Sequence, residues 1–326
     1  MRPHWTRSLL ALTAIVASAL FAREGNAESW PSRPVTIVVP FAAGSTGDLV
    51  ARSLAEHLAR ECGQPFVIDN RSGAGGNVGG AAVARATADG YTLLLATTGP
   101  AANNKLMYKS MPYDPQRDFA PIVLVGKSPV IITARNELPA ANLKELFEYA
   151  KANPGKVTAG YPGNGTLGHI TGELMQQRTG TKFIQVQYRG APAIISDLLG
   201  AHIDIGMDST APYVPLVQGK QLRALAIASA TRWSKLPDVP TVSESAFPGF
   251  EATVWYAFVA PRQTPPEIIA KLNAATNSYL KTKAATDLFE NLGIQADGGT
   301  PEELKSFIDA ELAKWAPIID AANIQF

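Results

Sequence analysis

The chain has 326 residues, of which 46% are hydrophobic and 17% are charged, and its formal net charge is +1. This is the balance of a globular protein with room for two domains of roughly 100–200 residues each. A nearly neutral chain without clusters of Lys and Arg lacks the electrostatic footprint of a nucleic-acid-binding protein. The single cysteine, Cys62, excludes an intramolecular disulfide.

The N-terminal segment has the features of an export signal. Arg2 and Arg7 flank a basic start, residues 8–21 form an apolar run, and small residues precede a cut after Ala27. The run is too short and too rich in alanine for a good membrane span. No cysteine lies near the cut, which argues against a lipoprotein anchor. We therefore expect a signal peptide at residues 1–27 and a mature protein that is exported and soluble.

The stretch from residue 35 to 52 predicts a strand, a short loop and a helix. A β-branched run forms the strand, and Pro40 ends it because proline cannot donate to a β-ladder. The unpaired N–H groups of a helix's first turn attract carboxylate or phosphate, and the small residues at 42–47 would let a ligand reach the backbone. The stretch alone fits equally well an anion-binding loop and an ordinary turn capped by Asp48, Ser45 or Thr46.

The same alternation continues along the chain. Further strands are expected at residues 65–69, 91–97, 119–125, 129–133, 156–161, 184–188, 203–207, 222–228 and 254–260. Helices are expected at residues 143–152, 170–179, 192–199, 265–281, 284–292 and 301–321. This alternation predicts mostly parallel sheets covered by helices on both sides. The loops at 42–48, 71–80 and 97–100 all follow strands, so we expect them at one sheet edge, where such folds bind ligands.

The order of these elements predicts two α/β lobes, with the second inserted into the first. Lobe one would comprise residues 28–127 plus 254–326, and lobe two residues 128–253. The junctions at about 127 and 254 would then be paired hinge strands, with a cleft between the lobes.

Tests for enzyme motifs predict no catalytic site. Gly73 and Gly75 are followed by Val78 where the dinucleotide fingerprint needs its third glycine. Gly126-Lys127-Ser128 resembles the end of a phosphate-binding loop, but residue 121 is a proline, and there is no G-x-S-x-G nucleophile elbow. Hydroxyl and amide groups without an activated base favour recognition over turnover. We therefore expect no catalytic residue, no metal and no cofactor.

A series of long motifs runs along nearly the whole mature chain. They are PFAAGSTGD at 40–48, NRSGAGGN at 70–77, DGYTL at 89–93, YRGA at 188–191, DLLG at 197–200, LRALA at 222–226, LPDVPTV at 236–242 and GTPEE at 299–303. This series resembles that of the substrate-binding proteins of tripartite tricarboxylate transporters, the Bug receptor family.

The resemblance implies an α/β, two-lobed periplasmic-binding-protein fold of type II, a Venus flytrap that closes around a small carboxylated solute without catalysis. Amides and hydroxyls of the first loop would hold the carboxylate, often through ordered waters. In this chain those positions are Phe41, Ala43, Gly44, Ser45, Thr46 and Asp48. The loop with Gly76 and Asn77, together with Thr98, would extend the wall of lobe one. The candidates from lobe two are Thr166, His169, Ala191 and Asp208.

Structural alternatives stand beside three of these candidates. Asp48 and His169 could instead cap helices, and Asn77 could stabilise its own loop. The chain also departs from the family pattern at two positions. Ser45 replaces the family's second glycine, and Gly47 stands where Thr or Ser is usual before the Asp. A side chain at position 45 either narrows the pocket or adds a hydroxyl donor.

The identity of the ligand stays open at this point. A dicarboxylate, an acidic amino acid, an aromatic carboxylate and a nicotinate-like ring all suit a pocket of amides and hydroxyls. No Arg or Lys is placed for a second carboxylate, which favours one anchored acid group. We expect a monomer that serves membrane permease subunits of a tripartite transporter. The alternative is a ligand sensor that signals to a membrane sensor kinase without transport.

Overall fold

The protein is described here by a computed structural model that covers residues 30–326. Residues 33–326 form one compact unit, which contains every element discussed below. The predicted signal peptide at 1–27 lies outside the described residues. Within residues 30–326, no helix combines the length and the apolar character needed to cross a membrane.

The strands of the compact unit are joined in one continuous hydrogen-bonded path. Their order is β2-β1-β3-β9-β4-β7-β5-β6, and β8 and β10 also pair with β4. The bounds are β1 (Val35–Val39), β2 (Phe66–Asn70), β3 (Thr92–Thr97), β4 (Phe119–Ala134), β5 (Thr158–Tyr161), β6 (Ile184–Gln187), β7 (Ile205–Ser209), β8 (Arg223–Ile227), β9 (Thr253–Pro261) and β10 (Gln295–Gly298).

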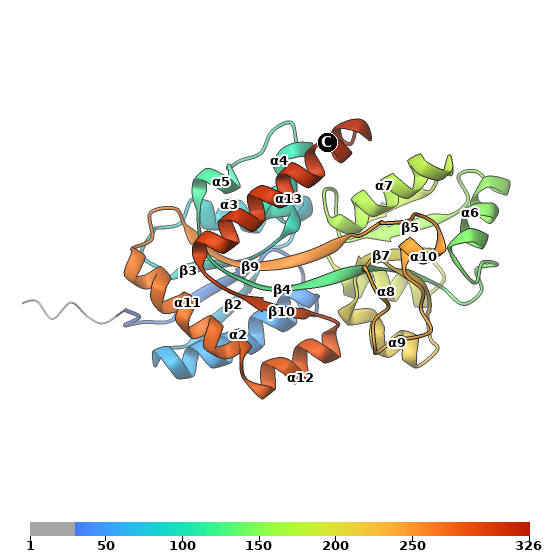
Figure 1. Ribbon diagram of the computed structural model, residues 1–326. Helices are drawn as coiled ribbons and strands as arrows, with labels where there is room; N and C mark the ends of the chain where they lie inside the picture. Colours follow the sequence, from blue (N-terminus) through green and yellow to red (C-terminus); the bar gives the residue numbers. More distant parts are fainter. Residues whose placement is uncertain (1–29) are drawn as a thin grey trace, which may run out of the picture. The chain divides into compact units, whose positions relative to one another are not determined.

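Helices connect and cover these strands (Figure 1). The α-helices are α2 (Thr46–Cys62), α3 (Asn77–Ala84), α4 (Asn104–Met107), α5 (Pro115–Asp118), α6 (Leu143–Ala152), α7 (Leu167–Thr179), α8 (Ala191–Leu199), α9 (Val214–Gln218), α10 (Val242–Ser245), α11 (Pro266–Leu280), α12 (Lys283–Leu292) and α13 (Pro301–Ala321). Short helices of other types are η1 (Ala74–Gly76), η2 (Gly99–Asn103) and η3 (Ala211–Tyr213). Local sequence fixes several ends: Thr300 and Glu303 form a capping box that starts α13. Gly63 and Gly180 end α2 and α7 in the left-handed conformation.

The predicted two-lobed α/β fold is confirmed, but its sheets are mixed. In lobe one, β1 pairs parallel with both β2 and β3, so the loops that follow these strands share one edge as predicted. In lobe two, β5 pairs parallel with β6 and β7. However, β9 runs antiparallel to β3, and β4 runs antiparallel to β7 and β8. The prediction of mostly parallel sheets missed these pairings because β4 and β9 pass through both lobes.

One long strand replaces two that the sequence predicts separately. The expected strands at 119–125 and 129–133 form the 16-residue strand β4, and Gly126 lies in its interior. A Cβ at this position would lie 2.7 Å from the carbonyl oxygen of Gln295 on β10, so glycine permits that pairing. The sequence pattern treated the Gly-Lys-Ser segment as a break, whereas the glycine serves close packing of a neighbouring strand.

The predicted junctions at about 127 and 254 lie side by side. Lys127 pairs with Trp255 and Ser128 with Val254 in the antiparallel ladder between β4 and β9. Figure 1 shows both strands running together from the strands of lobe one to those of lobe two. This pairing fits a hinge, and the residue limits of the two lobes stay a prediction.

The C-terminal segment contacts both lobes. The first half of α13 contributes Leu304 to the apolar cluster that also contains Val38 and Leu94 of lobe one. Its last turns contribute Trp315 and Ile319 to a cluster built mainly from lobe-two residues. The end of the chain therefore adds apolar contacts across the junction between the lobes.

Candidate functional site

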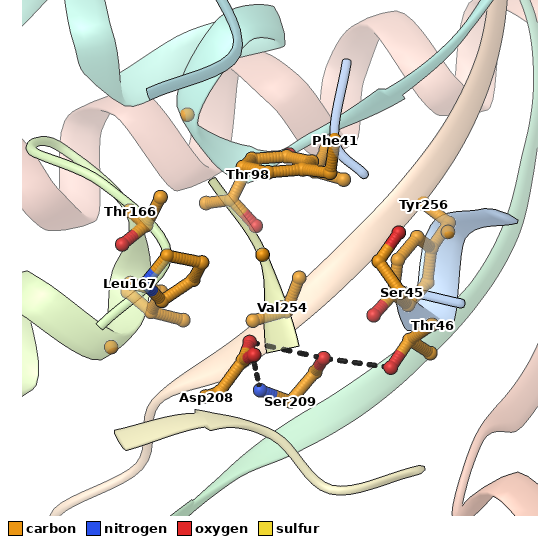
Figure 2. Close-up of a pocket in the computed structure, with 16 residues that line it drawn as sticks. Phe41, Ser45, Thr46, Thr98, Thr166, Leu167, Asp208, Ser209, Val254 and Tyr256 are labelled. Carbon is orange, nitrogen blue, oxygen red and sulfur yellow. Dashed lines mark hydrogen bonds between the residues drawn. The ribbon is translucent and has the colours of Figure 1, made fainter. Parts of the chain in front are cut away.

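A cavity lies where the loops of the two lobes meet, with about 480 Å³ of space that no atom fills, part of it open to solvent. Its walls follow the carboxyl ends of β1, β3, β5, β6 and β7, with two residues from β9 (Figure 2). The lining residues are Phe41, Ser45, Thr46, Gly47, Thr97, Thr98, Gly99, Pro162, Thr166, Leu167, Gly168, Gly190, Asp208, Ser209, Val254 and Tyr256. Strand ends are the usual place for a ligand in such sheets.

The first turn of α2 faces this cavity. Ser45 is the N-cap: its hydroxyl oxygen accepts from the amide of Asp48 at 3.4 Å, and its carbonyl accepts from Leu49 at 3.0 Å. The amides of Thr46 and Gly47 are the remaining first-turn donors, and both residues line the cavity. A helix of 17 residues thus presents unpaired N–H groups and the positive end of its dipole to the space.

Two helices of lobe two begin at the same cavity. Thr166 is the N-cap of α7, but its hydroxyl donates to the carbonyl of Gly163 at 2.7 Å and caps no amide. Leu167 and Gly168, the first residues of α7, both line the cavity. Gly190, the N-cap of α8, has no side chain and also lines it. Helix N-termini from both lobes therefore point positive ends and free amides at one space.

The hydroxyl groups around the cavity have defined partners. Thr98 accepts a hydrogen bond from the amide of Trp255 at 3.1 Å, so its own proton is free for a ligand. Thr46 and Ser209 are hydrogen-bonded to each other at 2.8 Å. Figure 2 shows Thr98 beside the Phe41 ring and opposite the Thr46–Ser209 pair. The wall thus offers both hydroxyl donors and an aromatic surface.

The only ionisable carboxyl group among the lining residues is that of Asp208. It is buried, and its Oδ1 accepts from the amide of Ser209 at 2.6 Å. Burial raises the pKa of Asp208 to about 7, because its effect is larger than that of the hydrogen bonds from Ser209 and Tyr213, which lower the pKa. Burial also raises the pKa of Tyr213 and of Tyr256, so both phenols are neutral. No Arg, Lys or His lines this cavity in the described part of the chain.

The structure brings Phe41, Ser45, Thr46, Thr98, Thr166 and Asp208 of the predicted site residues together around the cavity. Ala191 is the first residue of α8, next to the lining Gly190, and is buried. Ala43 and Gly44 lie in the same loop as Ser45 but are exposed and do not line the cavity. Their roles as ligand contacts stay predictions.

Four other predicted residues are engaged inside the protein. Asp48 is 2% exposed and accepts from the Gly44 amide at 2.9 Å, from Arg52 and from Asn70. Asn77 accepts from Asn104 at 2.7 Å, and Gly76 packs against Pro40 and Pro100. The Nε2 atom of His169 lies 3.4 Å from a carboxylate oxygen of Glu173, and its ring makes tilted contacts with the rings of Tyr161 and Phe326. These contacts hold Asp48 and Asn77 inside the protein, and the N-cap of α2 is Ser45 and not Asp48. None of the four lines the cavity.

Sequence reasoning missed several lining residues. Ser209 directly follows Asp208 at the end of a buried strand. Its position could have predicted a place in the site, because the ends of strands form the site. Val254 and Tyr256 come from β9, two residues apart and therefore on one face. Nothing in an apolar run of this kind marks which face meets a ligand.

Comparison with known proteins identifies the family of this chain. Residues 50–324 match the model of the tripartite tricarboxylate transporter family receptor. The chain belongs to this receptor family. The protein BugT of Bordetella pertussis is 36% identical over 317 residues, which cover 97% of each chain. The predicted family membership is thereby confirmed, and the chain is a solute-binding receptor and not an enzyme.

Two solved structures of the same fold were determined with small carboxylates. Rpa4515 of R. palustris, with adipate, has a TM-score of 0.87 and 36% identity, covering 91% of this chain and 99% of its own. MatC from Rhodopseudomonas palustris, with bound malate, has a TM-score of 0.86 and 30% identity, covering 89% and 100%. The receptor is thus similar in fold and sequence to proteins that bind carboxylates.

Proposed function

We propose that this receptor works in the periplasm, where it captures a small carboxylate in the cavity between its lobes and delivers it to membrane permease subunits of a tripartite transporter. The observation that carries the proposal is the convergence of the α2, α7 and α8 N-termini on one cavity. Positive helix ends attract an anion without the use of a cationic side chain.

The ligand carboxylate would bind at the first turn of α2. The amides of Thr46 and Gly47 and the free hydroxyl proton of Thr98 are the donors on the lobe-one side. From lobe two, the amides of Leu167 and Gly168 would complete its coordination when the lobes close. This division between two lobes supports a closing mechanism, because each lobe alone supplies only part of the donor set.

Family membership and the relatives support the rest of the proposal. Adipate and malate in two similar structures are small acids, and the family is named for its tricarboxylate transporters. The paired hinge strands β4 and β9 would allow the lobes to open and close around such a ligand.

The first test is identification of the ligand. Native mass spectrometry of the purified mature protein, followed by denaturation, should release a stoichiometric carboxylate. An empty protein should show a raised melting temperature with at least one carboxylate in a broad panel, because a ligand that binds only the native state stabilises it. If no carboxylate either copurifies or raises the melting temperature, the proposal fails.

The location of the site is tested with a matched pair of variants at one position. Ser45→Trp fills the cavity and removes the α2 cap, whereas Ser45→Ala removes only the cap. We expect Ser45→Trp to weaken carboxylate binding at least ~100-fold and Ser45→Ala less than ~10-fold, as for loss of one hydrogen bond. Equal effects of the two variants would place the ligand elsewhere.

Delivery to a transporter needs a separate experiment in cells. A strain without this chain should lose uptake of the identified carboxylate, and the wild-type chain but not Ser45→Trp should restore it. Unchanged uptake, together with loss of ligand-dependent gene expression, would instead support signalling to a sensor kinase.

A further inference from the structure

A buried carboxyl group faces the proposed anion site, and no cation accompanies it. Asp208 is the residue before the last one of β7, has 8% of its surface exposed and lies on the cavity wall beside Ser209 and Val254 (Figure 2). An acidic side chain in a pocket for anions lowers the affinity for any negative group near it. Its presence therefore needs a reason in the chemistry of the ligand.

The two oxygens of Asp208 differ in their partners. Oδ1 accepts from the amide of Ser209 at 2.6 Å and from its hydroxyl at 3.3 Å. Oδ2 has only the Tyr213 hydroxyl, at the long distance of 3.5 Å. A carboxylate oxygen can accept two hydrogen bonds, so Oδ2 has capacity for a further donor. Protein groups thus supply the hydrogen bonds of Oδ1, and Oδ2 can accept a further hydrogen bond from a ligand in the cavity.

We propose that Asp208 determines specificity by accepting a hydrogen bond from a second polar group of the ligand, so that the receptor selects a monocarboxylate bearing an ammonium or hydroxyl group over a dicarboxylate. The inference rests on the proposed function, since it takes the ligand carboxylate to lie at the α2 N-terminus. Asp208 would bind the polar group at the other end of the ligand.

The surroundings of Asp208 support this selection. Tyr213 of η3 and Tyr256 of β9 are the titratable groups that approach it, and both are neutral phenols. The first turns of α2 and α7 face it with hydroxyl, amide and apolar groups, and His169 on α7 is directed to Glu173 instead. Ile131 is its partner on β4. A ligand ammonium or hydroxyl would compensate a charge that no cationic side chain of the cavity lining neutralises, whereas a second carboxylate would add a like charge.

The test is calorimetry with a matched four-carbon series at about pH 8, where Asp208 is ionised. The probes are butyrate, the 2- and 4-hydroxybutyrates, the 2- and 4-aminobutyrates and succinate. We expect at least one probe with a donor to bind roughly tenfold or more tightly than both butyrate and succinate, the range of a charged hydrogen bond. Asp208→Asn should reduce this preference to within about threefold, because the amide has no charge to be compensated.

The control variant is Asp238→Asn, which removes the same charge from an exposed position outside the cavity. It should keep the wild-type ranking. Succinate or butyrate binding as tightly as every donor-bearing probe would overturn the inference, as would an unchanged ranking in Asp208→Asn. Binding of carboxylates without discrimination would leave the proposed function intact, whereas failure of every carboxylate, here and in a wider panel, would remove both.

Discussion

The hydroxyl groups of Thr46 and Ser209 form a hydrogen bond of 2.8 Å that joins the first turn of α2 in lobe one to the end of β7 in lobe two. Two further bonds join the lobes nearby: the amide of Ala42 donates to Arg189 at 3.3 Å, and the Tyr108 hydroxyl donates to Asn164 at 2.8 Å. Contacts between lobes thus surround the cavity, so closure and ligand binding should be coupled.

The Thr46–Ser209 bond should contribute to closure. Thr46→Val and Ser209→Ala each remove one hydroxyl, and we expect each to weaken carboxylate binding about fivefold to tenfold, the range for one buried hydrogen bond. The double variant should cost less than the sum of the single changes, because both singles break the same bond. Calorimetry of the four proteins measures the coupling. Strict additivity would show that the two hydroxyls act independently on the ligand.

The arrangement of the site could be predicted largely from strand order. Loops that follow parallel strands must share an edge, so the sequence pattern predicts that Ser45 and Thr98 lie together. The motif series added Thr166 and Asp208 from lobe two. Family membership, the two-lobed fold and the side-by-side course of the chain near residues 127 and 254 were also predictable from the sequence.

The remaining features depend on pairing across the fold. The antiparallel run of β4 and β9 is not visible in apolar segments, since a strand buried on both faces shows no alternation. For the same reason, the sequence does not show that Tyr256 faces the cavity. The sequence offered a capping role or a ligand role for Asp48, and a loop-stabilising role or a ligand role for Asn77. Only the positions of Arg52, Asn70 and Asn104 show the hydrogen bonds of these two side chains.

Gly75 should be necessary for the lobes to close. It has φ +61°, and a Cβ there would overlap the carbonyl oxygen of Asn164 in lobe two. Gly75→Ala should therefore weaken ligand binding by ~10-fold or more, because one added methyl at a tight contact costs about 1–3 kcal/mol. The matched control is Gly155→Ala, with φ +67° and no atom within 4 Å of the added Cβ.

Both glycine variants carry the same backbone strain, so their melting temperatures should fall to a similar extent. Only Gly75→Ala should lose affinity in calorimetry and show a larger radius of gyration with ligand in X-ray scattering. Equal affinities of the two variants would mean that closure does not require this contact.

Asp48 should act on stability and not directly on the ligand. Burial raises its pKa, but hydrogen bonds from Arg52, Gly44 and Asn70 outweigh this effect, so that its pKa is lowered overall. Asp48→Asn should reduce the free energy of unfolding by about 1–3 kcal/mol near neutral pH, the range for a buried hydrogen-bonded charge. Asp287→Asn, which removes an exposed carboxylate paired with Lys283 four residues away, should leave stability nearly unchanged.

The contribution of Asp48 also has a definite dependence on pH. A carboxyl group with a lowered pKa in the folded state stabilises the protein above its unfolded pKa of about 4 and loses this effect as pH falls through the folded value. Urea unfolding of wild type and Asp48→Asn should therefore converge in acid. A difference that persists unchanged in acid would mean that the side-chain charge is not what stabilises the loop.

The contribution of Asp208 to stability should depend on pH in the opposite direction to that of Asp48. Burial raises its pKa to about 7, so between about pH 4 and about pH 7 the ligand-free folded state binds more protons than the unfolded state. Stability relative to Asp208→Asn should fall as pH rises through this window and stay level above it. Tyr213 and Tyr256, the titratable neighbours of Asp208, are neutral throughout because burial raises their pKa values.

Urea unfolding of ligand-free wild type and Asp208→Asn at about pH 5, 6, 7 and 8 measures how this stability difference changes with pH. A stability difference that rises with pH would show that Asp208 is stabilised as a carboxylate by the helix N-termini around it, and that its charge is already compensated before a ligand binds.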